Sequence, residues 1–200
     1  MPFQWAAIGQ HLPDNHVATI VSHLHEVTDM AENKILLRVA EHDDAWSIAR
    51  LHTRSWQAAY CDILPAAYLL EKVPAEHASH WENYMARPAE ARGLVMLAER
   101  NGTAVGFVSA ENVDDSSHGT LLDCLHVLPT HQGCGAGKLM IAAVRGWTRE
   151  RNQNLMHLYV LDANARAIAF YERNGWRFAG TKASYIDTTP VIDRRYLIDV

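Results

Sequence analysis

The residues with the clearest chemical pattern stand between His131 and Lys138, in the segment HQGCGAGK. Gln132, Gly135 and Gly137 fit the spacing Gln-x-x-Gly-x-Gly, and an amphipathic stretch follows at once. Small residues let consecutive backbone N–H groups approach an anion, and the positive end of a helix dipole adds to the attraction. The segment therefore predicts a phosphate-binding loop at the start of a helix.

Two other phosphate motifs do not fit this segment. A P-loop that ends at Gly137 and Lys138 requires glycine in place of Gln132 and Ser or Thr in place of Leu139, so the hydroxyl ligand for Mg²⁺ is missing. A dinucleotide fingerprint that starts at Gly133 has Lys138 where its third glycine belongs. These mismatches argue against a nucleotide-binding protein of either class.

The composition confines the anion site to local features. The chain has 200 residues, of which 48% are hydrophobic, and a formal net charge of −5 at pH 7. That hydrophobic fraction is ample for a packed domain. The negative charge gives no general attraction to nucleic acid or acidic membranes, so we expect neither as a partner. Backbone dipoles and a few cations must hold the anion, and Lys138 and Arg166 are the candidates.

Several features predict a cytoplasmic location. The sequence has three cysteines, Cys61, Cys124 and Cys134. Their odd number and the lack of close paired spacing favour a reducing compartment over a disulfide framework. No apolar run reaches the roughly 18 to 20 residues that a membrane span requires. The first residues lack the basic start and the long apolar block of a secretory signal.

The histidines do not predict a metal site. The sequence has 12 histidines, including the pairs His23-x-His25 and His77-x-x-His80. Neither pair comes with an evident third ligand in a recognisable pattern. We interpret them as scattered surface histidines and expect no metal.

The elements that must position the loop follow from hydrophobic periodicity. Residues 1–33 form a polar, histidine-rich N-terminal extension, and residues 34–200 form the main domain. Alternating or continuous apolar patterns predict strands over 35–40, 94–100, 103–112, 120–129, 155–161, 176–186 and 194–200. Helical spacing predicts helices over 41–60, 62–73, 139–150 and 164–175, and a further turn or two over 77–87. A hairpin before a βαβα unit predicts a mixed sheet.

The order of these parts resembles the GCN5-related N-acetyltransferase (GNAT) family. LHVLPTHQGCGAGKLM is similar to that family's acetyl-CoA motif, a strand ending in x-V-x-P followed by Q/R-x-x-G-x-G/A and a helix. NARAIAFYERNGWRFAG is similar to its second signature, Asn, then a helix with Phe-Tyr-Glu, then Asn-Gly and an aromatic residue. The resemblance covers about residues 34–200. It implies an α/β (α+β) fold with a mixed, mostly antiparallel central sheet flanked by helices.

The resemblance also implies acetyl-CoA as co-substrate, with the CoA pyrophosphate in the glycine loop. In this family the strand before the loop is splayed from its neighbour, so backbone groups from His126 to Leu128 would face the pantetheine arm and the thioester carbonyl. By position, the residues expected to contact the coenzyme are His126, Val127, Leu128, Gln132, Gly133, Cys134, Gly135, Ala136, Gly137, Lys138, Asn164, Arg166 and Tyr171.

Direct acetyl transfer has three chemical needs: a neutral amine, a polarised thioester carbonyl and a proton for the departing thiolate. Alkyl ammonium groups titrate near ~10.4, so a base must remove a proton or the site must bind the neutral form. A strand N–H can stabilise the oxyanion, and no covalent enzyme intermediate is needed. The resemblance makes Tyr171 the general acid, whereas a tyrosine whose ring merely packs is the structural alternative.

Three residues are candidates for the base, and each also has a structural explanation. Glu111 ends a strand, Asp123 lies within the strand before the glycine loop, and His126 lies beside the expected thioester position. Strand alternation places Asp123 and His126 on opposite faces unless a bulge intervenes. We favour Glu111, acting through water.

The amine acceptor is not identified by the residues. The segment around residues 54–70 and the last hairpin should form its pocket, with Trp56, Tyr60 and Tyr185 as lining candidates. A small-molecule amine, a peptide N-terminus and a lysine side chain all stay open. The alternative function is a non-catalytic acyl-CoA-binding or sensing module, with the extension serving a partner. Exposed apolar surface on the extension or the last hairpin would favour a homodimer.

Overall fold

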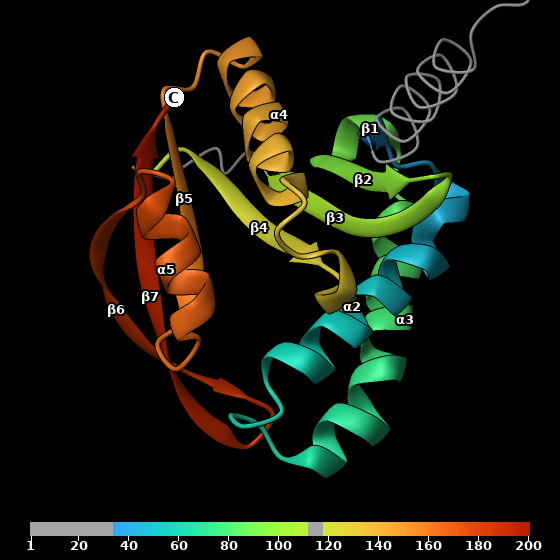
Figure 1. The fold of residues 1–200 in the computed structure, drawn as a ribbon, viewed down its shortest axis with the longest axis vertical. Helices are drawn as coiled ribbons and strands as arrows, with labels where there is room; N and C mark the ends of the chain where they lie inside the picture. Colours follow the sequence, from blue (N-terminus) through green and yellow to red (C-terminus); the bar gives the residue numbers. More distant parts are fainter. Residues whose placement is uncertain (1–33, 112–117) are drawn as a thin grey trace, which may run out of the picture. The chain divides into compact units, whose positions relative to one another are not determined.

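The structure is a computed structural model that describes residues 34–111 and 118–200. The chain divides into two compact units, Met1–Lys34 and Ile35–Val200. The second unit contains the strands and helices described below (Figure 1). The predicted N-terminal extension, residues 1–33, lies outside the described residues, as do residues 112–117.

A seven-stranded sheet forms the centre of the second unit, in the order β1-β2-β3-β4-β5-β7-β6. Its strands are β1 (Ile35–Val39), β2 (Leu94–Arg100), β3 (Thr103–Glu111), β4 (Thr120–Val127), β5 (Leu155–Leu161), β6 (Arg177–Ile186) and β7 (Thr189–Asp199). Neighbouring strands are antiparallel, except that β4 and β5 are parallel. The predicted mixed, mostly antiparallel sheet is therefore confirmed.

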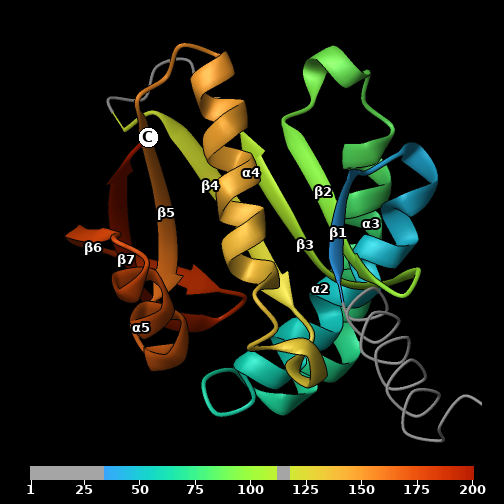
Figure 2. The same ribbon diagram turned by 45° about the horizontal axis from the view of Figure 1, so that its top comes forward.

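Helices cover both faces of this sheet. They are α2 (Ala45–Ala59), α3 (Val73–Met85), α4 (Ala136–Glu150) and α5 (Ala165–Arg173), with short turns η1 (His42–Asp44), η2 (Tyr68–Lys72, a π-helix), η3 (Ala89–Ala91) and η4 (Pro129–His131). Figure 2 shows α4 in front of β3 and β4, with α2 and α3 behind them. One core includes Met140 and Val144 of α4, and a second includes Ile48 of α2 and Trp81 of α3. No helix in the described part of the chain is long and apolar enough to cross a membrane.

The segment between α2 and β2 differs from the prediction. Instead of a helix over 62–73 followed by a separate turn or two, η2 runs directly into α3, which is 13 residues long. Pro74 lies in the first turn of α3. A proline is tolerated there because the first N–H groups of a helix have no partner within the helix. The predicted boundary after residue 73 is therefore absent from the structure, where η2 and α3 follow one another without a break.

The strands β4 and β5 start together and then separate. Among the described residues they pair only at Thr120 with Met156 and at Leu121 with His157. The chain enters this joint through Gly119, where a Cβ atom would lie 2.0 Å from the carbonyl oxygen of Leu155. Beyond Leu121, β4 continues to Val127 paired with β3 alone (Figure 1). The free side of β4 therefore faces a gap in the sheet, as the family resemblance implies.

A β-bulge in β4 changes which face its side chains occupy. Ser109 pairs with Cys124 and Ala110 with Leu122, so Asp123 is the extra residue. Leu122 belongs to the core beneath α4, whereas Cys124 belongs to the core beneath α2 and α3. Simple alternation would place these two side chains on one face, and the bulge removes that constraint.

Two buried imidazoles join α2 to α3. The rings of His52 and His77 stack with centroids 3.7 Å apart and planes 4° apart. Both residues are 7% exposed, so the interpretation of His77 as a surface histidine is wrong. The indole Nε1–H of Trp81 donates to His52 Nδ1 at 3.1 Å. Burial, followed by the nearby His80, lowers the pKa of His77 to about 4, and burial moves the pKa of His52 further in the same direction.

These buried histidines predict a loss of stability in mild acid. An unfolded histidine titrates near ~6.5, so below that pH the unfolded chain takes up protons that the folded His77 refuses until about pH 4. The contribution is fully present above pH ~6.5 and is lost as the pH falls, by on the order of 3 kcal/mol for His77. We expect the Tm of His77→Gln to fall less between pH 6.5 and 4 than the Tm of the unaltered protein. His42→Gln, which alters an exposed histidine, is the matched control, and equal slopes for all three proteins would contradict this account.

Candidate active site

The glycine loop presents unpaired backbone donors at the start of α4. Gly133 and Gly135 have φ of 86° and 88°, in the left-handed region that favours glycine. Gly135 is the N-cap of α4, and no described side chain caps the helix. The Nε2 of Gln132 donates to the Val127 carbonyl at 3.1 Å and so ties the loop to the end of β4. The first-turn N–H groups of α4 are left available for an anion.

Gly137 serves a different purpose from Gly135. A Cβ atom on Gly137 would lie 3.0 Å from Cζ of Phe170, so its lack of a side chain lets α4 and α5 approach closely. A Cβ atom on Gly135 would meet nothing within 4 Å, so this glycine is needed for its backbone angle alone. Lys138 in α4 and Arg166 in α5 are both exposed and can bring positive charge to a ligand near the loop.

The backbone of β4 offers one clear donor to the gap. The Leu128 N–H donates to the Val105 carbonyl at 2.8 Å and is therefore committed to β3. Along an antiparallel pair, successive residues direct their N–H and C=O groups to opposite sides. The backbone N–H and C=O groups of Val127 accordingly point away from β3. The hydrogen bond from Gln132 to the Val127 carbonyl agrees with this direction. Of the three residues His126, Val127 and Leu128, the backbone N–H of Val127 is the one that faces the gap.

Tyr171 lies buried at the gap, with a tyrosine and a cysteine around it. It belongs to α5 and is 8% exposed. Burial, followed by Tyr60 and Cys124, raises its pKa well above the ordinary value, so the hydroxyl keeps its proton at neutral pH. Asn164 caps α5, because its side-chain oxygen accepts from the Ala167 N–H at 3.1 Å.

Tyr60, directly after the end of α2, is one of the residues near the Tyr171 hydroxyl. Burial raises the pKa of Tyr60 to about 12, and the Asn164 side chain, hydrogen-bonded to its hydroxyl, acts in the opposite direction. Asn164 therefore joins the start of α5 to the end of α2. The structure thus gives Asn164 a structural role besides the coenzyme contact expected from its position.

The two candidate carboxylates lie further along the strands. Glu111 ends β3 opposite Leu121, at the point where β4 and β5 are still paired. Asp123 projects from the bulge, is exposed, and accepts from the Ser109 hydroxyl at 3.4 Å. Burial first, and then both carboxylates, raise the pKa of the Cys124 thiol. Neither carboxylate is among the groups that act on the Tyr171 hydroxyl.

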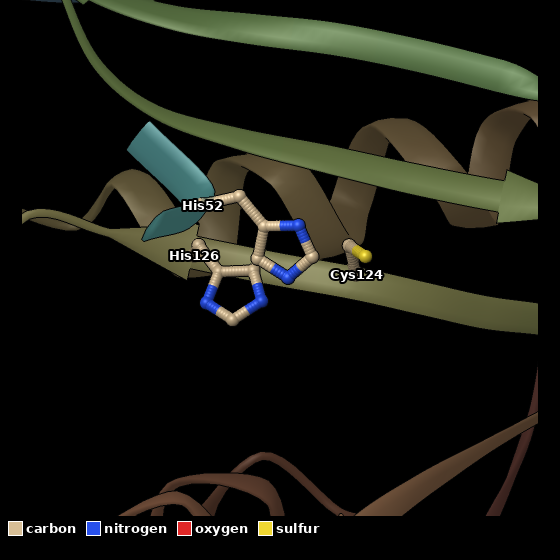
Figure 3. Close-up of side chains that lie close together, drawn as sticks. All are labelled: His52, Cys124 and His126. Carbon is tan, nitrogen blue, oxygen red and sulfur yellow. The ribbon is translucent and has the colours of Figure 1, made fainter. Parts of the chain in front are cut away.

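His52, Cys124 and His126 form a cluster that the sequence did not reveal (Figure 3). Their side-chain nitrogen and sulfur atoms lie within 4.8 Å of one another. Helical spacing placed His52 on the buried face of its helix, but gave no sign that it meets β4. Burial, followed by His77, lowers the pKa of His126 to about 3, so this ring is neutral at physiological pH.

The hydrogen bond from Trp81 opposes a metal ion in this cluster. His52 accepts at Nδ1, so the neutral ring must carry its proton on Nε2, the nitrogen that a metal would need. If that proton moved to Nδ1, the Nδ1–H of His52 would face the Nε1–H of Trp81, and two donors cannot form a hydrogen bond. Trp81 is 1% exposed and has no room to turn away. The donor set therefore fits a neutral imidazole better than a metal ligand.

The expected acceptor side is only partly assembled from the predicted residues. Trp56 and Tyr60 pack with Ile186 and Val191 of the last hairpin around a small core that includes Leu64. Tyr185 is 73% exposed. A hollow of about 210 Å³ lies between the end of β5, the start of β7 and the loop after α2, lined by Ile63, Leu161, Asp162, Ala163, Pro190, Val191 and Ile192.

Comparisons with known proteins agree with this geometry. The chain is 24% identical over 140 residues to the uncharacterized N-acetyltransferase YuaI of Bacillus subtilis (strain 168), covering 69% of this chain and 78% of the relative. It is 32% identical over 127 residues to the [ribosomal protein bS18]-alanine N-acetyltransferase of Escherichia coli (strain K12), covering 63% and 82%. The crystal structure of the PaiA N-acetyltransferase of Thermoplasma acidophilum in complex with coenzyme A has a similar fold, with a TM-score of 0.64, 19% identity and coverage of 80% of this chain and 98% of that one.

A family model matches more than half of the chain. Residues 46–176 match the model of the Acetyltransferase (GNAT) family. The match runs from the start of α2 through the glycine loop and α5 to Trp176, so it includes both sides of the gap between β4 and β5. The chain belongs to the Acetyltransferase (GNAT) family.

Proposed function

We propose that this protein transfers the acetyl group of acetyl-CoA directly to an amine in a ternary complex. The main support for the proposal is the gap between β4 and β5. It lies between the uncapped glycine loop and the buried Tyr171. The Thermoplasma acidophilum structure of similar fold is a complex with coenzyme A. The Escherichia coli relative is named as an alanine N-acetyltransferase. Both support the proposed co-substrate and reaction.

The coenzyme would lie along the free side of β4. Its pyrophosphate would accept from the backbone N–H groups between Gln132 and Lys138, with Lys138 and Arg166 supplying positive charge. The pantetheine amides would pair with β4 as an added strand does, because Val127 leaves its N–H on that side. This arrangement carries the thioester back along the free side of β4, toward the buried Tyr171 hydroxyl.

The chemistry then proceeds without a covalent enzyme intermediate. The neutral amine attacks the thioester carbon, and the carbonyl oxygen gains negative charge, which a second backbone N–H on the free side of β4, farther from the loop than Val127, stabilises. The carbon–sulfur bond breaks, and Tyr171 gives its proton to the departing thiolate. The hydroxyl carries a proton at neutral pH, as a general acid requires. Glu111 would accept the amine proton through water.

The acceptor would approach from the side of Trp56, Tyr60 and the last hairpin, where aromatic and aliphatic groups predominate. A small-molecule or peptide amine fits this description. Acetyl-CoA binding by calorimetry, followed by thiol release over small amines, polyamines, amino acids and short peptides, would define the acceptor class. Binding without turnover on any acceptor would favour the non-catalytic acyl-CoA-binding module instead.

Gly135→Ala should weaken acetyl-CoA binding about tenfold. A side chain in the left-handed region costs about 1 kcal/mol or more, and the loop would relax away from the conformation that aims its N–H groups. Gly102→Ala is the matched control, since Gly102 has a φ of 70° and open space around it but lies in the β2–β3 turn. Calorimetry with acetyl-CoA measures both variants. Equal affinities for the two would remove the loop from the coenzyme site.

Tyr171→Phe should lower kcat about 100-fold or more and leave acetyl-CoA affinity unchanged. The ring still packs against Trp176, but the proton for the thiolate is gone. Tyr159→Phe, on the exposed side of β5, controls for removal of a tyrosine hydroxyl. Steady-state thiol release with the acceptor from the screen gives kcat, and calorimetry gives affinity. Unchanged turnover in Tyr171→Phe would end its role as the acid.

Glu111→Gln should lower kcat by about 100-fold at neutral pH, and the deficit should shrink as the pH rises. Higher pH supplies neutral amine and so makes the base less necessary. Asp123→Asn is the matched comparison, because both carboxylates act on the Cys124 thiol. A pH–rate profile of the two variants separates them. A deficit in Asp123→Asn alone would transfer the role of base to Asp123.

A further inference from the structure

We propose that Trp81, His52 and His126 form a one-way chain of N–H donors that ends on the carbonyl oxygen of the bound thioester. His126 would then be a second oxyanion donor, beside a backbone N–H on the free side of β4, and His52 and Trp81 would be positioning residues. This proposal rests on the proposed acetyl-CoA site. It gives a role to three side chains that no step of the proposed reaction has used.

The direction of the chain is set by Trp81. An indole nitrogen can only donate, so its bond of 3.1 Å to His52 Nδ1 makes that nitrogen an acceptor. Trp81 is 1% exposed and packs edge-on against Phe107, with centroids 5.3 Å apart, so the donor is held in place. A neutral His52 must then carry its proton on Nε2.

His52 stays neutral because of its surroundings. It is 7% exposed, and the three other imidazoles near it, those of His126, His77 and His80, disfavour a further positive charge. The stacked His77 ring bonds to Thr53 through Nδ1 at 3.1 Å. In the described part of the chain the charged groups that act on the His52 ring are other imidazoles, so the ring stays neutral, and the bond from Trp81 leaves its proton on Nε2.

The Nε2–H group of His52 lies on the side of the ring that faces His126. The two ring centroids lie 4.6 Å apart, and Figure 3 shows one nitrogen of each ring on the side of the other. A nitrogen of each ring and the Cys124 sulfur lie within 4.8 Å of one another, and a bridging water between the two rings would complete the chain. The nearer nitrogen of His126 then accepts, so its proton is on the nitrogen farther from His52. Hydrogen bonds aligned in one direction polarise one another and strengthen the last donor.

The end of the chain lies where charge would develop. His126 precedes Val127, whose N–H faces the gap, and its side chain is partly exposed on the part of β4 that β5 has left. A neutral imidazole N–H can polarise a carbonyl without carrying a positive charge of its own. The same neutrality makes His126 a poor base, because a ring that resists protonation cannot hold the amine proton.

Isotope-edited infrared spectroscopy of the full chain with acetyl-CoA labelled with ¹³C at the carbonyl tests the last donor. The carbonyl stretch should shift to lower wavenumber on binding, and His126→Phe should lose a large part of this shift while keeping the stacking with Phe107. The exposed His80 lies near the cluster but outside the chain, so His80→Phe should behave like the unaltered protein. An equal shift in His126→Phe and the unaltered protein would overturn the proposal.

The shift depends on binding alone, so it separates this proposal from the proposed function. A lost shift in His126→Phe with no turnover in any protein would support the donor and count against the transferase. Absence of acetyl-CoA binding by the unaltered protein would overturn both. With the acceptor from the screen, kcat of His126→Phe should fall about 100-fold with KM for acetyl-CoA unchanged, as for loss of one oxyanion donor.

The tautomers of His52 and His126 test the positioning roles of His52 and Trp81. In ¹⁵N-labelled protein, long-range NMR correlations should place the His52 proton on Nε2 and give His126 a single neutral tautomer. Trp81→Phe should leave His52 as a mixture of tautomers and reduce the carbonyl shift. A His52 proton on Nδ1 in the unaltered protein would overturn the chain, and this measurement requires no variant to fold.

Discussion

The short pairing of β4 with β5 is the constraint on which the rest of the site depends. Two neighbouring parallel strands would ordinarily satisfy each other's N–H and C=O groups along their whole length. Here the pairing ends after Leu121 and His157, and β4 runs on with one side unpaired. Unpaired backbone groups are costly when buried without water or ligand. A ligand with amides of its own, spaced like an extended chain, can meet that need along the free side of β4.

The gap persists because the elements around it cannot close it. At one end Gly119 brings the chain against the Leu155 carbonyl, which fixes where the strands meet. On one face Phe170 of α5 already touches Gly137 of α4. At the other end the last hairpin packs on the segment after α2, with Ile186 and Val191 against the core around Leu64. The strands are thus held apart by packing that lies outside the gap.

Local patterns predicted most elements, and the failures have physical causes. The Asn101-Gly102 turn, the glycine loop and the Asn164 cap depend on neighbours in the sequence, and the structure has all three. The bulge at Asp123 depends on how β4 registers with β3, which no local pattern records. The contact of His52 with His126 joins a helix to a strand far along the chain. The direct succession of η2 and α3 depends on a π-helical turn before Pro74, which hydrophobic periodicity does not record.

The titratable groups at the gap share one tendency, which bears on the amine itself. Burial raises the pKa of Tyr60, Tyr171 and Cys124 and lowers the pKa of His126, so each group is moved toward its neutral form. The exposed cations Lys138 and Arg166 lie on α4 and α5, apart from this buried group. An amine that enters the same surroundings is subject to the same desolvation, which lowers its pKa and favours the nucleophilic form. In the proposed function the site would therefore divide its work by charge, with an anion at the loop and neutral reactants along the free side of β4. A carboxylate that acts through water, as proposed for Glu111, would then suffice as a proton acceptor, because burial would already have weakened the hold of the amine on its proton.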